Sequence, residues 1–156
     1  MPEALRLVRA RAEDAELLRA LQEQAFSELL RTYGDHGRSP AEETVEQVRA
    51  HITAPGSCYY LLMVGDEPVG GIRVIDPGDG GTKRIAPLFL LPEHRRKGFG
   101  SRAVREVERL HGETGWQLNT ILQEEGNCRF YEALGYRRMT TRLRINERTD
   151  IIFYAK

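Results

Sequence analysis

Apolar and polar residues follow two different periods along the chain, and the changes of period separate expected strands from expected helices. From Leu5 to Ala10 apolar and basic residues alternate, which is typical of a strand with one solvent-facing side. Over residues 13–31 apolar residues recur every three or four positions, as along one face of a helix. Ser39, Pro40 and Glu42 then have the spacing of an N-cap, a first helical residue and a capping box. The first third of the chain therefore predicts a strand and two helices.

The middle of the chain is rich in β-branched and aromatic residues. Residues 58–64 and 69–75 flank the turn sequence GDEP, which predicts a hairpin, and residues 82–91 predict a third antiparallel strand. Residues after Gly98 return to the helical period and predict an amphipathic helix up to position 110. This pattern places Glu108 on the solvent-facing side of that helix and Leu110 on its apolar side.

The C-terminal part predicts a strand, a short helix and two further strands. The helix is expected at residues 127–134, and Gly135 closes it. The strands are expected at residues 116–122, 137–145 and 150–156. The order of elements is βααβββαβαββ. We expect an α+β fold, with about four helices flanking a central, mostly antiparallel mixed sheet of about seven strands, as a single domain over residues 1–156.

The charge balance disfavours several classes of partner. The chain has 156 residues with 23 Lys plus Arg and 23 Asp plus Glu, so its formal net charge is zero. Such a chain has no strong basic field to attract nucleic acid, and no apolar run approaches the roughly 20 residues of a membrane span. The N-terminal sequence also lacks the apolar stretch of a signal peptide. We therefore expect a soluble cytoplasmic protein that binds neither nucleic acid nor membrane.

Cysteine and histidine residues predict no metal site. Cys58 and Cys128 lie in unrelated sequence contexts, so we expect two reduced thiols. His94 and His111 stand among charged residues and are expected to be solvent-exposed.

One turn combines three consecutive cations with two glycines, in the order Arg95, Arg96, Lys97, Gly98 and Gly100. The glycines leave the N–H groups of a first helical turn uncovered, with the positive end of the helix dipole behind them. These features predict a site for an anion with several phosphate oxygens. Two simpler interpretations stay open: the glycines only make a tight turn, and the cations are a solvated loop.

Other nucleotide-binding motifs fit this turn less well. GFGSRA formally matches G-x-G-x-x-A, but residues 92–97 separate it from the preceding strand, and that strand belongs to a hairpin pattern. A dinucleotide-binding oxidoreductase is therefore a distant alternative. The sequence G-x-x-x-x-G-K-[ST] of a P-loop does not occur.

Two segments resemble signature motifs of the GNAT superfamily of acyl-CoA-dependent N-acyltransferases. RRKGFG is similar to the phosphate turn R/Q-x-x-G-x-G/A of that family, and NCRFYEALGY is similar to its FYEKLGF segment. Close matching covers residues 84–136, and the order of elements agrees over the whole chain. The resemblance implies acetyl-CoA as co-substrate, bound between two splayed parallel strands. These are the fourth strand, ending near Leu91, and the fifth, beginning near Trp116.

The resemblance also implies which residues bind acetyl-CoA. The pantetheine arm would pair with the backbone of the fourth strand, and the pyrophosphate would lie on the amides of residues 96–101. Glu124 stands where many members have an asparagine that contacts the pantetheine. The expected cofactor-binding residues are Phe89, Leu90, Arg95, Arg96, Lys97, Gly98, Phe99, Gly100, Ser101, Glu124 and Asn127.

Tyr131 occupies the position of the tyrosine that, in this family, protonates the departing thiolate; simple packing is the alternative. A backbone N–H released by a bulge near residues 88–90 is the implied oxyanion donor. The general base is missing from its usual places, because Asn119 stands where some members carry glutamate. Glu124 or Glu125 as base stays open, beside deprotonation through ordered water or before binding.

The loop between the first two helices lines the acceptor pocket in this family. Tyr33, Asp35 and His36 of that loop, together with Asn119, are therefore the expected substrate-binding residues, and an ordinary surface turn is the alternative. Cys128 as an acyl carrier is disfavoured because no histidine lies near it in the sequence.

The resemblance thus implies an N-acetyltransferase that transfers an acetyl group from acetyl-CoA to a primary amine by direct transfer in a ternary complex. The amine can belong to a small molecule or to a protein. A non-catalytic acyl-CoA-binding sensor or regulatory module is the alternative from another functional class. We expect a monomer or a homodimer.

Overall fold

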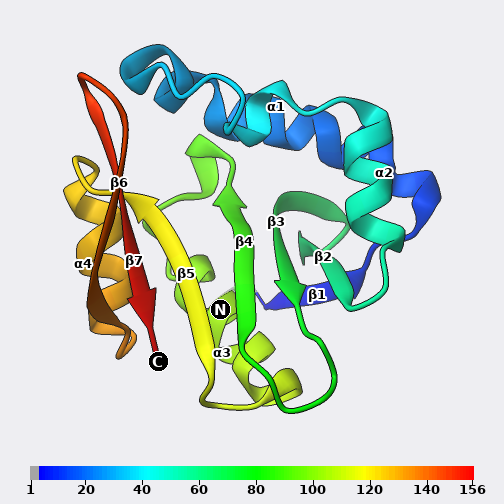
Figure 1. Ribbon diagram of the computed structural model, residues 1–156. Coiled ribbons are helices and arrows are strands. Elements are labelled where there is room, and N and C mark those ends of the chain that lie inside the picture. The colour runs from blue at the N-terminus through cyan, green and yellow to red at the C-terminus, as the bar shows by residue number, and fades with distance from the viewer. Residues whose placement is uncertain (1–3) are drawn as a thin grey trace.

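A seven-stranded sheet forms the centre of the computed structural model, which describes residues 4–156 (Figure 1). The elements follow the expected order βααβββαβαββ. Their bounds are β1 Leu5–Arg9, α1 Ala15–Tyr33, α2 Val45–Thr53, β2 Ser57–Val64, β3 Glu67–Ile75, β4 Lys83–Leu90, α3 Phe99–His111, β5 Trp116–Ile121, α4 Glu125–Ala133, β6 Arg137–Asn146 and β7 Thr149–Ala155.

The sheet has the strand order β1-β2-β3-β4-β5-β7-β6. Every neighbouring pair is antiparallel except β4 and β5, which run parallel. Only two register positions join these strands, Lys83 with Trp116 and Arg84 with Gln117. Beyond them the two strands diverge (Figure 1). The expected α+β fold with splayed fourth and fifth strands is confirmed.

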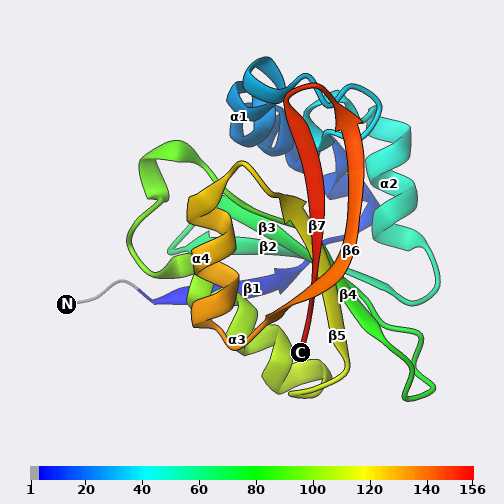
Figure 2. The same ribbon diagram turned by 60° about the vertical axis from the view of Figure 1, so that its left-hand side comes forward.

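Helices cover both faces of the sheet (Figure 2). On one face α1 and α2 pack through Leu18 and Val48 against β2 and the end of β4. On the other face α3 and α4 pack through Val104 and Tyr131 against the middle of the sheet. No helix among residues 4–156 is long and apolar enough to span a membrane.

The prediction for the start of the second helix was wrong. Ser39 does cap a helical turn, but this is a separate 3-10 turn, Pro40–Glu42. Glu43 is extended after it, and α2 starts from its own cap at Thr44. The result is an ordered loop between α1 and α2 instead of a longer helix.

The polar face of α3 was also predicted incorrectly at its C-terminal end. Glu108 is only 6% exposed, whereas Leu110 is 48% exposed. The Tyr136 hydroxyl donates to Glu108 Oε2 at 2.8 Å, and Lys156 Nζ lies 3.2 Å from the same carboxylate. Because the chain beyond α4 returns over this end of the helix, it covers a position that the helical period alone assigns to solvent.

The two histidines predicted to be exposed are largely covered. The His111 side chain is 12% exposed, and its ring nitrogens contact the Tyr60 hydroxyl at 3.0 Å and Asp76 Oδ2 at 2.8 Å. His94 packs with 13% of its side chain exposed beside Glu67. Both cysteines are free thiols, and Cys128 is buried.

Glu108→Ala tests the role of this buried carboxylate. The substitution removes the acceptor of the Tyr136 hydroxyl and the partner of Lys156, so the free energy of unfolding should fall by about 2 kcal/mol. Urea denaturation measures the change. Glu106→Ala is the matched control, because Glu106 lies on the same helix and pairs with exposed Arg109. The control should unfold like the wild type, and equal losses in both variants would contradict a structural role for Glu108.

Candidate functional site

Residues 96–101, called here the amide turn, complete the connection from β4 and form the first turn of α3. Arg96 and Gly98 have positive φ angles of 63° and 84°, which turns successive N–H groups towards one side. None of the N–H groups from Arg96 to Ser101 donates to another of the described residues. The N-terminal end of α3 adds its partial positive charge at the same place. The turn therefore has the donors and the field that an anion requires.

The two glycines of the amide turn serve different purposes. A Cβ at Gly98 would meet no protein atom within 4 Å. Glycine is therefore needed there for its positive φ angle, and because it leaves the backbone open to a ligand. A Cβ at Gly100 would approach the Phe130 ring to 3.1 Å. Gly100 thus lets α4 pack closely against the start of α3.

A cavity of about 540 Å³, called here the turn cavity, opens between the amide turn, α1, the end of β4 and α4. Most of the residues expected to bind the cofactor line it: Phe89, Leu90, Arg95, Arg96, Gly98, Gly100, Ser101, Glu124 and Asn127. Lys97 and Phe99 do not. Lys97 is exposed outside the cavity, and the Phe99 side chain is buried in the protein.

Arg95 differs from the other cations of the turn. Its Nε donates to the Leu90 carbonyl at 3.0 Å, and its Nη2 donates to the Ala25 carbonyl at 2.8 Å. The guanidinium therefore holds α1 against the end of β4, and it occupies one carbonyl that the sequence analysis assigned to the pantetheine arm.

The bulge in β4 lies just before its predicted position. The register with β3 shifts between Ile85 and Leu88, so that Ala86 and Pro87 leave regular pairing. Arg73 of β3 donates through Nε to the Ala86 carbonyl at 2.6 Å. The bulge therefore exposes a β4 carbonyl to a guanidinium that comes from the neighbouring strand β3.

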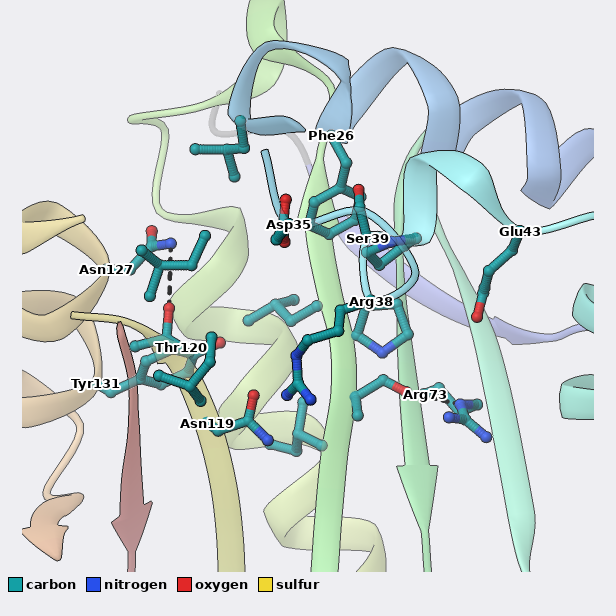
Figure 3. Close-up of a pocket in the computed structure, with 18 residues that line it drawn as sticks. Phe26, Asp35, Arg38, Ser39, Glu43, Arg73, Asn119, Thr120, Asn127 and Tyr131 are labelled. Carbon is teal, nitrogen blue, oxygen red and sulfur yellow. Dashed lines mark hydrogen bonds between the residues drawn. The ribbon is translucent and has the colours of Figure 1, made fainter. Parts of the chain in front are cut away.

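A second cavity, of about 270 Å³ and called here the loop cavity, lies under the loop 34–44 (Figure 3). Four charged side chains line it: Asp35, Arg38, Glu43 and Arg73. Asn119, Thr120 and Tyr131 close it on the side of β5 and α4. Asp35 and Asn119 were expected at the acceptor site, whereas the two arginines and Glu43 were not. An arginine within the apolar strand sequence VGGIRVI was the available signal for one of them.

Tyr33 and His36, also expected at the acceptor site, do not line the loop cavity. The Tyr33 hydroxyl donates to Glu124 Oε2 at 2.7 Å. Burial, with this hydrogen bond, raises the pKa of Tyr33 to about 12. His36 is exposed and pairs with Glu42 at 2.9 Å. Tyr33 therefore joins α1 to the loop before α4, and His36 stabilises the surface of the loop.

The loop 34–44 is held at both ends by buried or half-buried polar contacts. Gln22 is fully buried, and its Nε2 donates to the Pro40 carbonyl at 2.9 Å and to Glu43 Oε1 at 2.8 Å. At the other end Thr149 Oγ1 donates to the Tyr33 carbonyl at 2.7 Å. Figure 2 shows the β6–β7 hairpin reaching the end of α1 at this contact. The loop is therefore a fixed wall of the loop cavity.

The two cavities share five lining residues: Phe26, Leu29, Leu88, Asn127 and Tyr131. The Tyr131 hydroxyl makes no hydrogen bond to any residue between 4 and 156. Burial raises the pKa of Tyr131, so its hydroxyl stays protonated at neutral pH. A protonated hydroxyl that has no partner in the described part of the chain thus lies where the two cavities meet.

A model of the acetyltransferase (GNAT) family matches residues 15–136. No curated protein matches the chain significantly.

Several solved structures are similar in fold. An acetyltransferase from Thermus thermophilus is 19% identical with a TM-score of 0.73, covering 99% of this chain and 97% of that one. The PaiA N-acetyltransferase from Thermoplasma acidophilum, in complex with coenzyme A, is 16% identical with a TM-score of 0.75, covering 98% and 99%. A spermidine N-acetyltransferase from Vibrio cholerae, in complex with CoA and spermine, is 15% identical with a TM-score of 0.74, covering 96% and 93%.

Proposed function

This chain belongs to the acetyltransferase (GNAT) family, and we propose that it transfers an acetyl group from acetyl-CoA to a primary amine by direct attack in a ternary complex. One observation carries the proposal. The amide turn and the Tyr131 hydroxyl, whose donors have no acceptor among residues 4–156, border the same cavity, and that cavity meets a second one at Tyr131. A donor with a phosphate end and a reactive end fits the first cavity, and an acceptor fits the second.

Acetyl-CoA binding in the turn cavity follows from its chemistry. The amide turn offers several N–H donors to the pyrophosphate oxygens, and Arg96 adds a cation at the same rim. The end of β4 at Phe89 and Leu90 lines this cavity, and its backbone groups other than the Leu90 carbonyl, which Arg95 holds, are offered to the amides of the pantetheine arm. The structure of a similar acetyltransferase with coenzyme A supports this assignment of the donor.

Tyr131 supplies the proton for the departing thiolate. A thiol has a pKa of about 8.5 and a free tyrosine about 10, and burial raises the pKa of Tyr131 further. Transfer to a fully formed thiolate is therefore uphill, so the proton moves as the carbon–sulfur bond breaks.

Direct transfer agrees with the positions of the cysteines. Neither Cys58 nor Cys128 lines the turn cavity or the loop cavity, so no thiol is placed to carry the acetyl group between donor and acceptor. The carboxylate of Glu124 already accepts from Tyr33. The acceptor amine therefore loses its proton to water, either in the loop cavity or before it binds.

Release of free thiol from acetyl-CoA in the presence of a panel of primary amines tests the proposed activity. We expect acetyl-CoA to bind, by calorimetry, and at least one amine to accelerate thiol release over buffer. Binding without release for every amine would leave only an acyl-CoA-binding module. Absence of both binding and release would refute the proposed function.

Tyr131→Phe tests the proton donor. Turnover should fall about 100-fold while the Kd for acetyl-CoA stays unchanged, because general acid catalysis acts only as the thiolate leaves. Tyr154→Phe is the control, since Tyr154 is also buried but donates to Glu132 outside both cavities. Undiminished turnover in Tyr131→Phe would assign Tyr131 to packing.

Gly98→Ala tests the amide turn against a matched glycine. Gly98 and Gly78 have φ angles of 84° and 77°, and a Cβ at either position meets no atom within 4 Å. Both substitutions therefore carry a similar backbone strain. Only Gly98→Ala should weaken acetyl-CoA binding, by about 10-fold or more, because its methyl group lies where the pyrophosphate approaches. Equal Kd values for the two variants would place the pyrophosphate elsewhere.

A further inference from the structure

The charged groups of the loop cavity are not joined in direct ion pairs, although Glu43 and Arg73 attract each other at longer range. Asp35, Arg38, Glu43 and Arg73 all line it, yet no ion pair joins any two of them among the described residues. Figure 3 shows Arg38 reaching down between β4 and β5, whereas Arg73 lies beside β3, on the other side of β4. A cavity that keeps both signs of charge apart is suited to a ligand that carries both signs.

Asp35 is the unsatisfied acid of the cavity. It is 9% exposed, and its Oδ1 is buried without a hydrogen-bond partner among residues 4–156. A buried carboxylate oxygen without a donor costs free energy. A substrate ammonium group provides both the charge and the donors that this oxygen lacks.

Glu43 is occupied in a way that Asp35 is not. Its Oε1 accepts from Gln22 at 2.8 Å, and its Oε2 lies 3.5 Å from His51 Nδ1. These contacts fix Glu43 as part of the cavity wall. The cavity therefore has one carboxylate that is free to bind a cation.

The two arginines retain free donors. The Arg38 guanidinium has no acceptor among the described residues, and Arg73 uses only its Nε, on the Ala86 carbonyl. The planar fork of donors on a guanidinium matches the two oxygens of a carboxylate. Both side chains are therefore available to an anionic group that enters the loop cavity.

We propose that the acceptor is a free amino acid, whose ammonium group binds Asp35 and whose carboxylate binds Arg38 and Arg73 in the loop cavity. This proposal rests on the proposed acetyl transfer and specifies its substrate class. The ammonium group loses one proton to water, and the neutral amine attacks the thioester carbon. A carbon–nitrogen bond forms, the carbon–sulfur bond breaks, and the thiolate takes the proton of Tyr131. The second proton of the nitrogen leaves as the amide forms and returns through water to Tyr131.

The same charges disfavour a polyamine as acceptor. The similar enzyme from Vibrio cholerae was solved with spermine, which carries only cationic groups at neutral pH. In this chain such a ligand would face two guanidinium groups and one free carboxylate. A cavity of about 270 Å³ also fits a small molecule better than a folded protein surface.

Matched acceptor pairs test the proposal. Each pair is an amino acid and its decarboxylated amine: phenylalanine with phenethylamine, tyrosine with tyramine, and lysine with cadaverine, with spermidine as the polyamine. We expect thiol release from acetyl-CoA to show a kcat/KM about 30-fold higher for at least one amino acid than for its amine. Phenylalaninamide, which lacks the negative charge, should behave like phenethylamine.

Arg38→Met provides the test on the protein side. It should lower kcat/KM for the preferred amino acid about 30-fold without lowering that of the paired amine, which has no carboxylate for Arg38 to bind. Arg31→Met is the matched control, because Arg31 is exposed on α1 and lines neither cavity. The control should keep the wild-type preference.

Asp35→Asn adds a readout that does not depend on turnover. Without substrate the variant should be at least as stable to heat as the wild type, since it removes a buried charge whose Oδ1 has no hydrogen-bond partner among the described residues. It should also bind the amino acid about 10-fold more weakly by calorimetry. A large loss of thermal stability would mean that Asp35 has a structural partner, and it would overturn the proposal.

The outcomes separate this proposal from the acetyl transfer itself. Equal or higher kcat/KM for the decarboxylated amines or spermidine, unchanged by Arg38→Met, would overturn the amino acid and leave the acetyltransferase in place. If no acceptor releases thiol, the proposed function fails. Calorimetry then tests the amino acid as a ligand of the loop cavity. Binding of an amino acid that is lost in Arg38→Met supports this assignment, and the absence of binding to the wild type overturns it.

Discussion

The early loss of pairing between β4 and β5 is the constraint on which the site depends. Only two register positions hold these parallel strands together. The bulge at Ala86 and Pro87 then takes β4 out of regular register with β3. On the β3 side, a Cβ at Gly70 would collide with the Phe89 carbonyl, so glycine lets the two strands keep their contact beyond the bulge. Backbone groups that leave a ladder need other partners, and here a ligand can supply them.

Each wall of the divergence is made rigid in a different way. The amide turn is held by backbone conformation, while the loop 34–44 is held by side chains, with Gln22 on one side and the β6–β7 hairpin on the other. A satisfied buried network of this kind fixes one arrangement of the loop. Against that background the unpartnered oxygen of Asp35 is a local exception, and such exceptions are typical of binding sites.

The sequence predicted the parts of the molecule that depend on short-range patterns. The strand and helix order, the hairpin of β2 and β3 and the start of α3 follow from periodicity, glycines and turn residues. The motif resemblance further placed Tyr131 and the amide turn among the expected site residues. It also named Lys97 and His36, which line neither cavity.

Contacts between segments that are distant in the sequence could not be predicted from local sequence patterns. Glu108 is covered by Tyr136 and Lys156, which follow it by 28 and 48 positions. Arg73 and Arg38 meet one cavity only because β3 lies beside β4 and the loop passes above them. The two cavities differ in which groups of the protein bind the ligand. The amide turn recognises its ligand through backbone groups, so many sequences that adopt its φ angles can bind the same donor. The loop cavity recognises through side chains, so a few substitutions there change the acceptor without changing the fold.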